Sequence, residues 1–193
     1  MAITQEADEH LIGQARSGDA AAFEALIERY RSRVFRLAVR FTRNPDDAQE
    51  VLQEVFFTVY QKLGQFEGKS AFSTWLYRVA VNTALMRLRG RDKAELVSIS
   101  EFPDDSLPGE TEGKGPEDKI MTEQALARIE RAMIPLPADF KTVLILRDIE
   151  DFSNEETAEI MGLSVAAVKS RLHRARGFMR KKLEDLYKET TQP

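Results

Sequence analysis

The stretch from Asn154 to Arg176 reads NEETAEIMGLSVAAVKSRLHRAR and predicts two helices joined by a tight turn. Ser153 precedes it, and a serine followed three residues later by Glu156 is a capping box, in which each side chain satisfies a free backbone donor at a helix start. The first helix is expected to end at Gly162, and Ser164 is placed to cap a second helix two residues later. Two helices joined by so short a turn cannot be colinear, so the stretch predicts a helix-turn-helix.

The second of these helices has one apolar face and one basic face. Helical spacing places these apolar residues together: Val168, Leu172, Ala175, Met179 and Leu183. It places these hydrogen-bond donors on the remaining surface: Lys169, Ser170, His173, Arg174, Arg176 and Arg180. From Val165 to Lys182 the sequence has seven Lys and Arg residues and no Asp or Glu. Such a helix suits the DNA major groove; the alternative is a solvated amphipathic helix, but the cap, the turn and the missing acids together favour DNA.

Outside this motif the chain divides into helical parts and an acidic connection. The segment Asp104–Asp118, DDSLPGETEGKGPED, is rich in Pro, Gly and acids and has no apolar period, so it predicts a flexible linker. Apolar residues recur at helical spacing over residues 26–41, 51–63, 76–83 and 138–149, and no alternating strand pattern appears. The sequence predicts an all-α protein in which two helical domains, residues 1–95 and 120–193, are joined by a flexible acidic linker, residues 96–119.

A polar, acidic ridge is predicted on the helix that begins at Asn44-Pro45. Its members lie beside an apolar seam: Asp46, Asp47, Glu50, Gln53 and Glu54. Acids in the first turn also suit the helix dipole, and this simpler explanation accounts for Asp46 and Asp47 better than for Glu54.

The stretch Ser70–Arg78, SAFSTWLYR, places three aromatic residues in nine positions and contains the only tryptophan of the chain. It follows the glycine-bracketed loop Gly64–Lys69 and precedes Asn82 and arginines at positions 87, 89 and 91. Aromatic and basic residues in alternation suit single-stranded nucleic acid, because an unpaired base offers a π-face and its backbone offers charge. The same rings would equally close a helical core, and composition leaves both interpretations open.

The composition of the 193 residues narrows the function classes. No apolar run approaches the length of about 18 residues that a membrane span needs, so no membrane insertion is expected. The chain has no cysteine and two distant histidines, so neither a metal site nor another cofactor is expected. The start of the sequence lacks the pattern of a secretory signal, and a cytoplasmic protein is the simplest interpretation.

Three segments together resemble the extracytoplasmic-function (ECF) sigma factors of bacteria: VLQEVFFTVYQKL (51–63), GKSAFSTWLYRVAVN (68–82) and LPADFKTVLILRDIEDFSNEETAEIMGLSVAAVKSRLHRAR (136–176). The resemblance spans nearly the whole chain, in order. It implies an N-terminal domain that binds core RNA polymerase and the minus-10 promoter element, and a C-terminal domain that binds the minus-35 element. It also implies contact with the clamp helices and flap of the polymerase, and an anti-sigma factor as a further partner.

The resemblance assigns roles to residues. The polymerase-binding set is Asp47, Glu50, Gln53 and Glu54. The minus-10 set is Phe66, Lys69, Phe72, Ser73, Trp75, Arg78 and Asn82. The minus-35 set is Ser164, Val165, Lys169, Ser170, Arg171, His173, Arg174 and Arg176. One position departs from the family pattern, because Met86 stands where many relatives have a polar residue one turn beyond Asn82.

Two other function classes are compatible with part of the sequence. A stand-alone helix-turn-helix regulator, with an N-terminal half that senses a ligand or dimerises, explains the basic helix but gives the acidic ridge and the aromatic loop no role. An enzyme is disfavoured, because the sequence contains no Gly-rich phosphate loop, metal cluster or nucleophile–base motif, and no catalytic residue is expected.

Overall fold

The computed structural model describes residues 2–91 and 127–191, and the regular structure within these ranges is helical, without strands. These residues form two compact units: one contains residues 2–91 with 155–163, and the other contains residues 127–154 with 164–191. The predicted all-α class is confirmed. The predicted linker, residues 96–119, lies outside the described residues. Within the described ranges, no helix combines the length and apolar character needed to cross a membrane.

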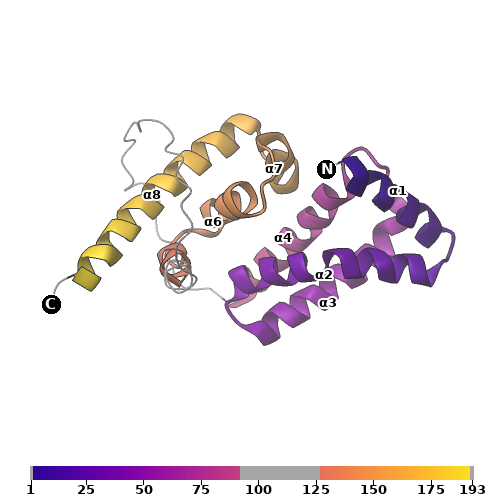
Figure 1. Cartoon of the computed structure of the whole chain (residues 1–193), viewed down its shortest axis with the longest axis horizontal. Helices are drawn as coiled ribbons and strands as arrows, with labels where there is room; N and C mark the ends of the chain where they lie inside the picture. The colour runs from indigo at the N-terminus through magenta and orange to yellow at the C-terminus, as the bar shows by residue number, and fades with distance from the viewer. Residues whose placement is uncertain (1, 92–126, 192–193) are drawn as a thin grey trace. The chain divides into compact units, whose positions relative to one another are not determined.

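Helices α2, α3 and α4 form the centre of the N-terminal part, and α1 packs against α2 (Figure 1). The elements are α1 (Ala2–Arg16), α2 (Ala20–Thr42), α3 (Pro45–Lys62), the short 3₁₀ helix η1 (Leu63–Gln65) and α4 (Phe72–Arg91). As predicted, α3 begins at Asn44-Pro45, and Pro45 is its first helical residue. The side-chain Oδ1 of Asn44 caps the helix by accepting from the backbone N–H of Asp46 at 2.8 Å.

Most residues of the predicted apolar stripes lie in the core of this part, although Phe56 and Val79 are only half-buried. The buried residues of α2 and α3 include Leu26, Tyr30, Val34, Leu37, Phe41, Val51, Leu52, Val55 and Val59. On α4, Leu76, Ala80 and Thr83 are also buried. Each stripe follows the 3.6-residue period, so one face of each helix is removed from water by the other two helices.

A buried carboxylate attaches α1 to α2. Asp8 is 4% exposed; it accepts hydrogen bonds from the Tyr30 hydroxyl and from Arg29 Nη1, the latter at 2.5 Å. Burial, together with the hydrogen bond to Asp8, raises the pKa of the Tyr30 hydroxyl above its ordinary value. The charge of Asp8 is thus compensated by two donors from α2.

In the C-terminal part, α6 (Ala138–Leu144) continues without a break into a π-helical segment, η3 (Ile145–Ile149), and packs against α8 (Val165–Thr191). Residues 127–133 are also helical. The predicted helix over residues 138–149 is therefore present, with a widened last turn. Along the chain between η3 and α8, the helix α7 (Asn154–Met161) begins directly after Ser153, as predicted, and its residues Thr157, Ala158 and Ile160 are buried.

Candidate nucleic-acid interface

The turn between α7 and α8 has the predicted geometry. Gly162 has φ +65°, a left-handed conformation that suits glycine, and the backbone N–H of Leu163 donates to the carbonyl of Ala158 at 2.9 Å. The Ser164 Oγ then accepts from the backbone N–H of Ala167 at 3.1 Å. The cap and the tight turn are confirmed, and α8 begins with free backbone donors at an exposed serine.

Helix α8 separates its apolar and polar faces as predicted. Val168, Leu172, Ala175 and Met179 are buried. Lys169, Ser170, His173 and Arg174 are exposed. With no acid between positions 165 and 182, the exposed face is cationic and rich in donors, as major-groove and phosphate recognition requires. Val165 is half-buried at the start of the helix.

Two predicted members of the minus-35 set have partners within the protein. Arg176 binds Asp148 in a bidentate pair, with Nε to Oδ2 at 3.0 Å and Nη2 to Oδ1 at 2.7 Å. Arg171 Nη1 lies 3.3 Å from Asp139 Oδ2. Both aspartates lie in the α6–η3 segment, so the two arginines attach α8 to that segment.

One side of α4 presents a second surface with exposed polar residues. Trp75, Arg78, Asn82 and Met86 follow one another at three- and four-residue spacing and lie on one side of the helix. Arg78 and Asn82 are exposed, and Met86 is 69% exposed.

The loop before α4 and the first turn of α4 carry the remaining polar residues of the predicted minus-10 set. It contains Lys69, which pairs with Glu67 and is otherwise open to solvent, and Gly68 at φ +72°. Ser73 is half-buried in the first turn of α4.

Three rings of the predicted minus-10 set form a packed cluster. The centroid of Phe66 lies 5.7 Å from that of Phe72 and 5.3 Å from that of Trp75, and the Phe72 and Trp75 centroids are 5.7 Å apart. Phe72 also packs edge-on against Tyr30 of α2. Phe66 and Phe72 are buried, whereas Trp75 is half-buried. The cluster therefore ties the loop to the core and leaves part of one ring at the surface.

The acidic ridge on α3 divides into a paired and an open part. Arg87 of α4 donates to Glu50 and, at 3.3 Å, to Asp47. The hydrogen bond to Glu50 and then that to Asp47 raise the pKa of the Arg87 guanidinium. Gln53 and Glu54 are exposed, and Gln53 also lines a small cleft of about 200 Å³ between α2 and α3.

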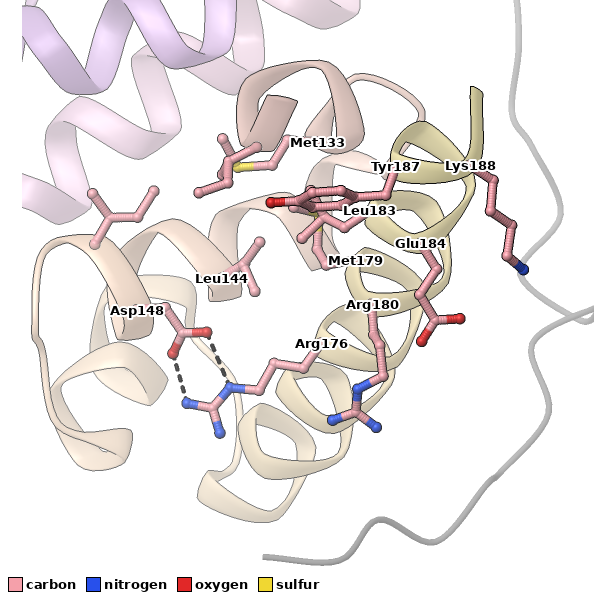
Figure 2. Close-up of a pocket in the computed structure, with 12 residues that line it drawn as sticks. Met133, Leu144, Asp148, Arg176, Met179, Arg180, Leu183, Glu184, Tyr187 and Lys188 are labelled. Atoms are coloured by element: carbon pink, nitrogen blue, oxygen red, sulfur yellow. Dashed lines mark hydrogen bonds and ion pairs between the residues drawn. The ribbon is translucent and has the colours of Figure 1, made fainter. Parts of the chain in front are cut away.

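An apolar groove in the C-terminal part was not predicted (Figure 2). It has a volume of about 830 Å³, and its lining includes Ile129, Met133, Leu144, Ile149, Met179, Leu183 and Tyr187. Arg128 lies over the Tyr187 ring, 4.7 Å from its centroid. Figure 2 shows the Asp148–Arg176 pair beside the groove. In the described residues no group of three or more His, Asp or Glu is arranged to hold a metal ion.

Comparison with known proteins assigns the chain to a family. Residues 26–94 match Sigma-70 region 2, and residues 126–179 match Sigma-70, region 4. The RNA polymerase sigma-H factor of Pseudomonas aeruginosa is 37% identical over 97% of this chain and 99% of its own length. The ECF RNA polymerase sigma-E factor of Escherichia coli K12 is 35% identical over 94% of this chain and 97% of its own. The chain belongs to the ECF sigma factor family.

Solved structures agree with this assignment. CnrH in complex with the cytosolic domain of CnrY has a TM-score of 0.70 and 26% identity, and the match covers 93% of this chain and 98% of that one. RpoE of Bartonella quintana in complex with the anti-sigma factor NepR has a TM-score of 0.60 and 25% identity, covering 84% and 96%. The ECF sigma factor described here is thus a promoter-recognition subunit that binds core RNA polymerase and promoter DNA, and it is not an enzyme.

Sequence reasoning missed the contacts that this ECF sigma factor makes between distant segments. The partners of Arg87, Arg171 and Arg176 lie 28 to 40 residues away in the sequence. The helical periodicity of hydrophobic residues gives no information about ion pairs between residues so far apart in the sequence. The groove was missed for the same reason, although Leu183 and Tyr187 on the otherwise charged end of α8 were a signal that its apolar face continues there.

Proposed function

We propose that this ECF sigma factor directs core RNA polymerase to promoters by reading the minus-35 element with its C-terminal domain, residues 120–193, and the minus-10 element with its N-terminal domain, residues 1–95. The observation that carries the proposal is the capped start of α8, with Lys169, Ser170, His173 and Arg174 exposed on one side. Because DNA and polymerase are cytoplasmic, the protein acts in the cytoplasm.

The minus-35 duplex is proposed to lie against the first three turns of α8. Ser164 and Val165 are at the helix start, where backbone donors and the dipole favour a phosphate. Lys169 and Arg174 supply charge and donors for guanine edges, while Ser170 and His173 lie between them on the exposed side.

The minus-10 element is proposed to be read as a melted strand at the start of α4. Lys69, Ser73, Arg78 and Asn82 offer charge and hydrogen bonds at the surface. Phe66, Phe72 and Trp75 support the loop from beneath, since the first two rings are buried. Unstacking a base costs a few kcal/mol, and polymerase docking together with duplex contacts would offset it.

Two surfaces are proposed for core polymerase. The ridge of Asp47, Glu50, Gln53 and Glu54 would dock on the clamp helices, with Glu54 the acid that lies open to a basic partner. The apolar groove beside α8 would take the flap, because a groove of about 830 Å³ lined by methionine, leucine and aromatic side chains suits an apolar helix.

Two further features are proposed from the family. The acidic linker would span the two promoter elements, avoid nonspecific capture by DNA through its charge, and occupy the path of the RNA. An anti-sigma factor would hold the protein inactive, as the complex of Bartonella quintana RpoE with NepR suggests for a relative.

A binding assay with core polymerase in the absence of DNA tests this function. The sigma factor should co-elute with core polymerase, whereas a stand-alone regulator should not. Glu54→Gln should weaken the complex about three- to tenfold, because it removes an exposed charge from the docking ridge. Glu24→Gln, an equally exposed acid of α2, is the matched control and should leave affinity unchanged. Failure of the wild-type chain to bind core polymerase contradicts the proposal.

A further inference from the structure

The two arginines of α8 that bind aspartates differ from the other cations of that helix. At about 100° per residue, Arg171 lies about 75° to one side of the apolar stripe of α8, and Arg176 lies about 65° to the other side. Each is paired with an aspartate of the α6–η3 segment, Asp139 and Asp148 respectively. The helix is therefore held by an ion pair on both flanks of its buried face.

We propose that Arg171 and Arg176 are positioning residues, which fix the rotation of α8 about its own axis. This orients the DNA-contacting side chains toward the minus-35 duplex: Lys169, Ser170, His173 and Arg174. This inference rests on the proposed function and separates the residues that contact DNA from the residues that hold α8 in place. The apolar stripe of Val168, Leu172, Ala175 and Met179 packs into the core without directional bonds. The pairs add direction: that of Arg176 is bidentate, the geometry in which an arginine–carboxylate pair is most specific.

A small rotation is sufficient to disturb recognition. A side-chain tip lies about 6 Å from the helix axis, so a rotation of about 20° moves it by about 2 Å. A hydrogen bond tolerates only a few tenths of an ångström around its normal length of about 2.7 to 3.2 Å. The two pairs also lie about 7.5 Å apart along the helix axis, which resists tilt as well as rotation.

The Asp148–Arg176 ion pair also lies next to the apolar groove. Figure 2 shows the Asp148–Arg176 pair beside the apolar groove, where the same helix continues into Met179, Leu183 and Tyr187. Helix α8 thus presents DNA-reading side chains in its first turns and groove-lining side chains further on. Arg176 lies between the DNA-contacting turns and the groove-lining turns of α8, so its ion pair with Asp148 attaches both parts of the helix to η3.

A charge swap tests the inference, because a DNA-contacting arginine and a positioning arginine respond oppositely to it. Wild-type chain with core polymerase first selects a duplex from a randomised 30-base-pair library. Binding of this duplex is then measured at several salt concentrations for Arg176→Asp, Asp148→Arg and the double variant. Core affinity is measured separately, since Asp148 and Arg176 both line the groove. The Asp139→Arg/Arg171→Asp swap, which lies away from the groove lining, is an independent second pair.

The inference predicts that each single variant at positions 148 and 176 weakens duplex binding about tenfold, and that the double variant recovers to within about threefold of wild type with an unchanged salt slope. Lys181→Ala, which removes a nearby exposed cation without a described pair, should change binding less than threefold. If the single variants do not fold, recovery of folding and binding in the double variant supports the inference equally.

Two results would overturn it. If Arg176 contacts phosphate, the double variant places Asp against DNA, binds no better than Arg176→Asp, and lowers the salt slope by about one. If the swap does not fold either, Arg176→Gln decides: a loss of binding with a reduced salt slope contradicts a positioning role. A wild-type holoenzyme that selects no duplex contradicts the proposed function itself, whereas an unrescued swap in an active holoenzyme contradicts only this inference.

Discussion

Trp75→Ala tests how the aromatic cluster contributes to the minus-10 site. The substitution removes the indole ring that packs against Phe66 at 5.3 Å and Phe72 at 5.7 Å between centroids. Each aromatic pair contributes about 0.5 to 1.5 kcal/mol beyond area burial, so the two pairs account for about 1 to 3 kcal/mol. Because Trp75 is half-buried, the total loss should be about 2 to 3 kcal/mol, below the range of about 3 to 5 kcal/mol for a fully buried ring.

The assay pairs unfolding with strand binding. Denaturant unfolding is followed by circular dichroism, because the variant lacks the only tryptophan, and binding of the reconstituted holoenzyme to a single-stranded minus-10 oligonucleotide is measured in parallel. Trp75→Phe keeps the packing, so it should lose less than about 1 kcal/mol of stability and bind the strand within threefold of wild type. The exposed Met86→Ala is the control and should change stability by less than about 0.5 kcal/mol. The reasoning is refuted if Trp75→Ala keeps full stability yet binds the strand tenfold less well, because the ring would then contact a base directly.

Three further predictions concern other parts of the protein. Arg174→Ala should cost about 1 to 3 kcal/mol of duplex binding and relax preference at one base pair, measured by competition between promoter variants; equal weakening of all sequences would mean a phosphate contact instead. Ser164→Ala should cost about 1 kcal/mol of unfolding free energy through the lost bond to Ala167, whereas Ser170→Ala should not. Tyr30→Phe should remove a pH-dependent component of the free energy of unfolding. Because the pKa of Tyr30 is raised in the folded state, the folded protein keeps the hydroxyl proton above pH 10 whereas the unfolded chain loses it. The free energy of unfolding of the wild type should therefore fall as pH rises past 10, and that of the variant should fall less.

The predictions that succeeded rest on local periodicity and capping. The buried face of α8, the start of α3 at Pro45 and the Gly162 turn each follow from residues within one or two turns of each other, where backbone sterics and hydrogen bonding decide the outcome. Helix α1 was not predicted, because no apolar stripe was identified there; a polar cluster around the buried Asp8 helps to hold it.

The functional surfaces could be predicted only in part. The donors on the outer face of α8 are visible in the sequence, but it does not show which of them are already paired. Arg174 and Arg176 look alike in sequence, and only the position of Asp148 on η3 distinguishes them. In SAFSTWLYR, burial places Phe72 in the core and Arg78 at the surface, a distinction that composition alone did not give.

Run-off transcription tests the central claim most directly. Wild-type chain and core polymerase are incubated with fragmented bacterial genomic DNA, and the 5′ ends of the transcripts are sequenced. The account predicts transcripts that depend on the added chain and start downstream of a shared pair of sequence elements at a fixed spacing. Transcripts that are identical with and without the chain would contradict it.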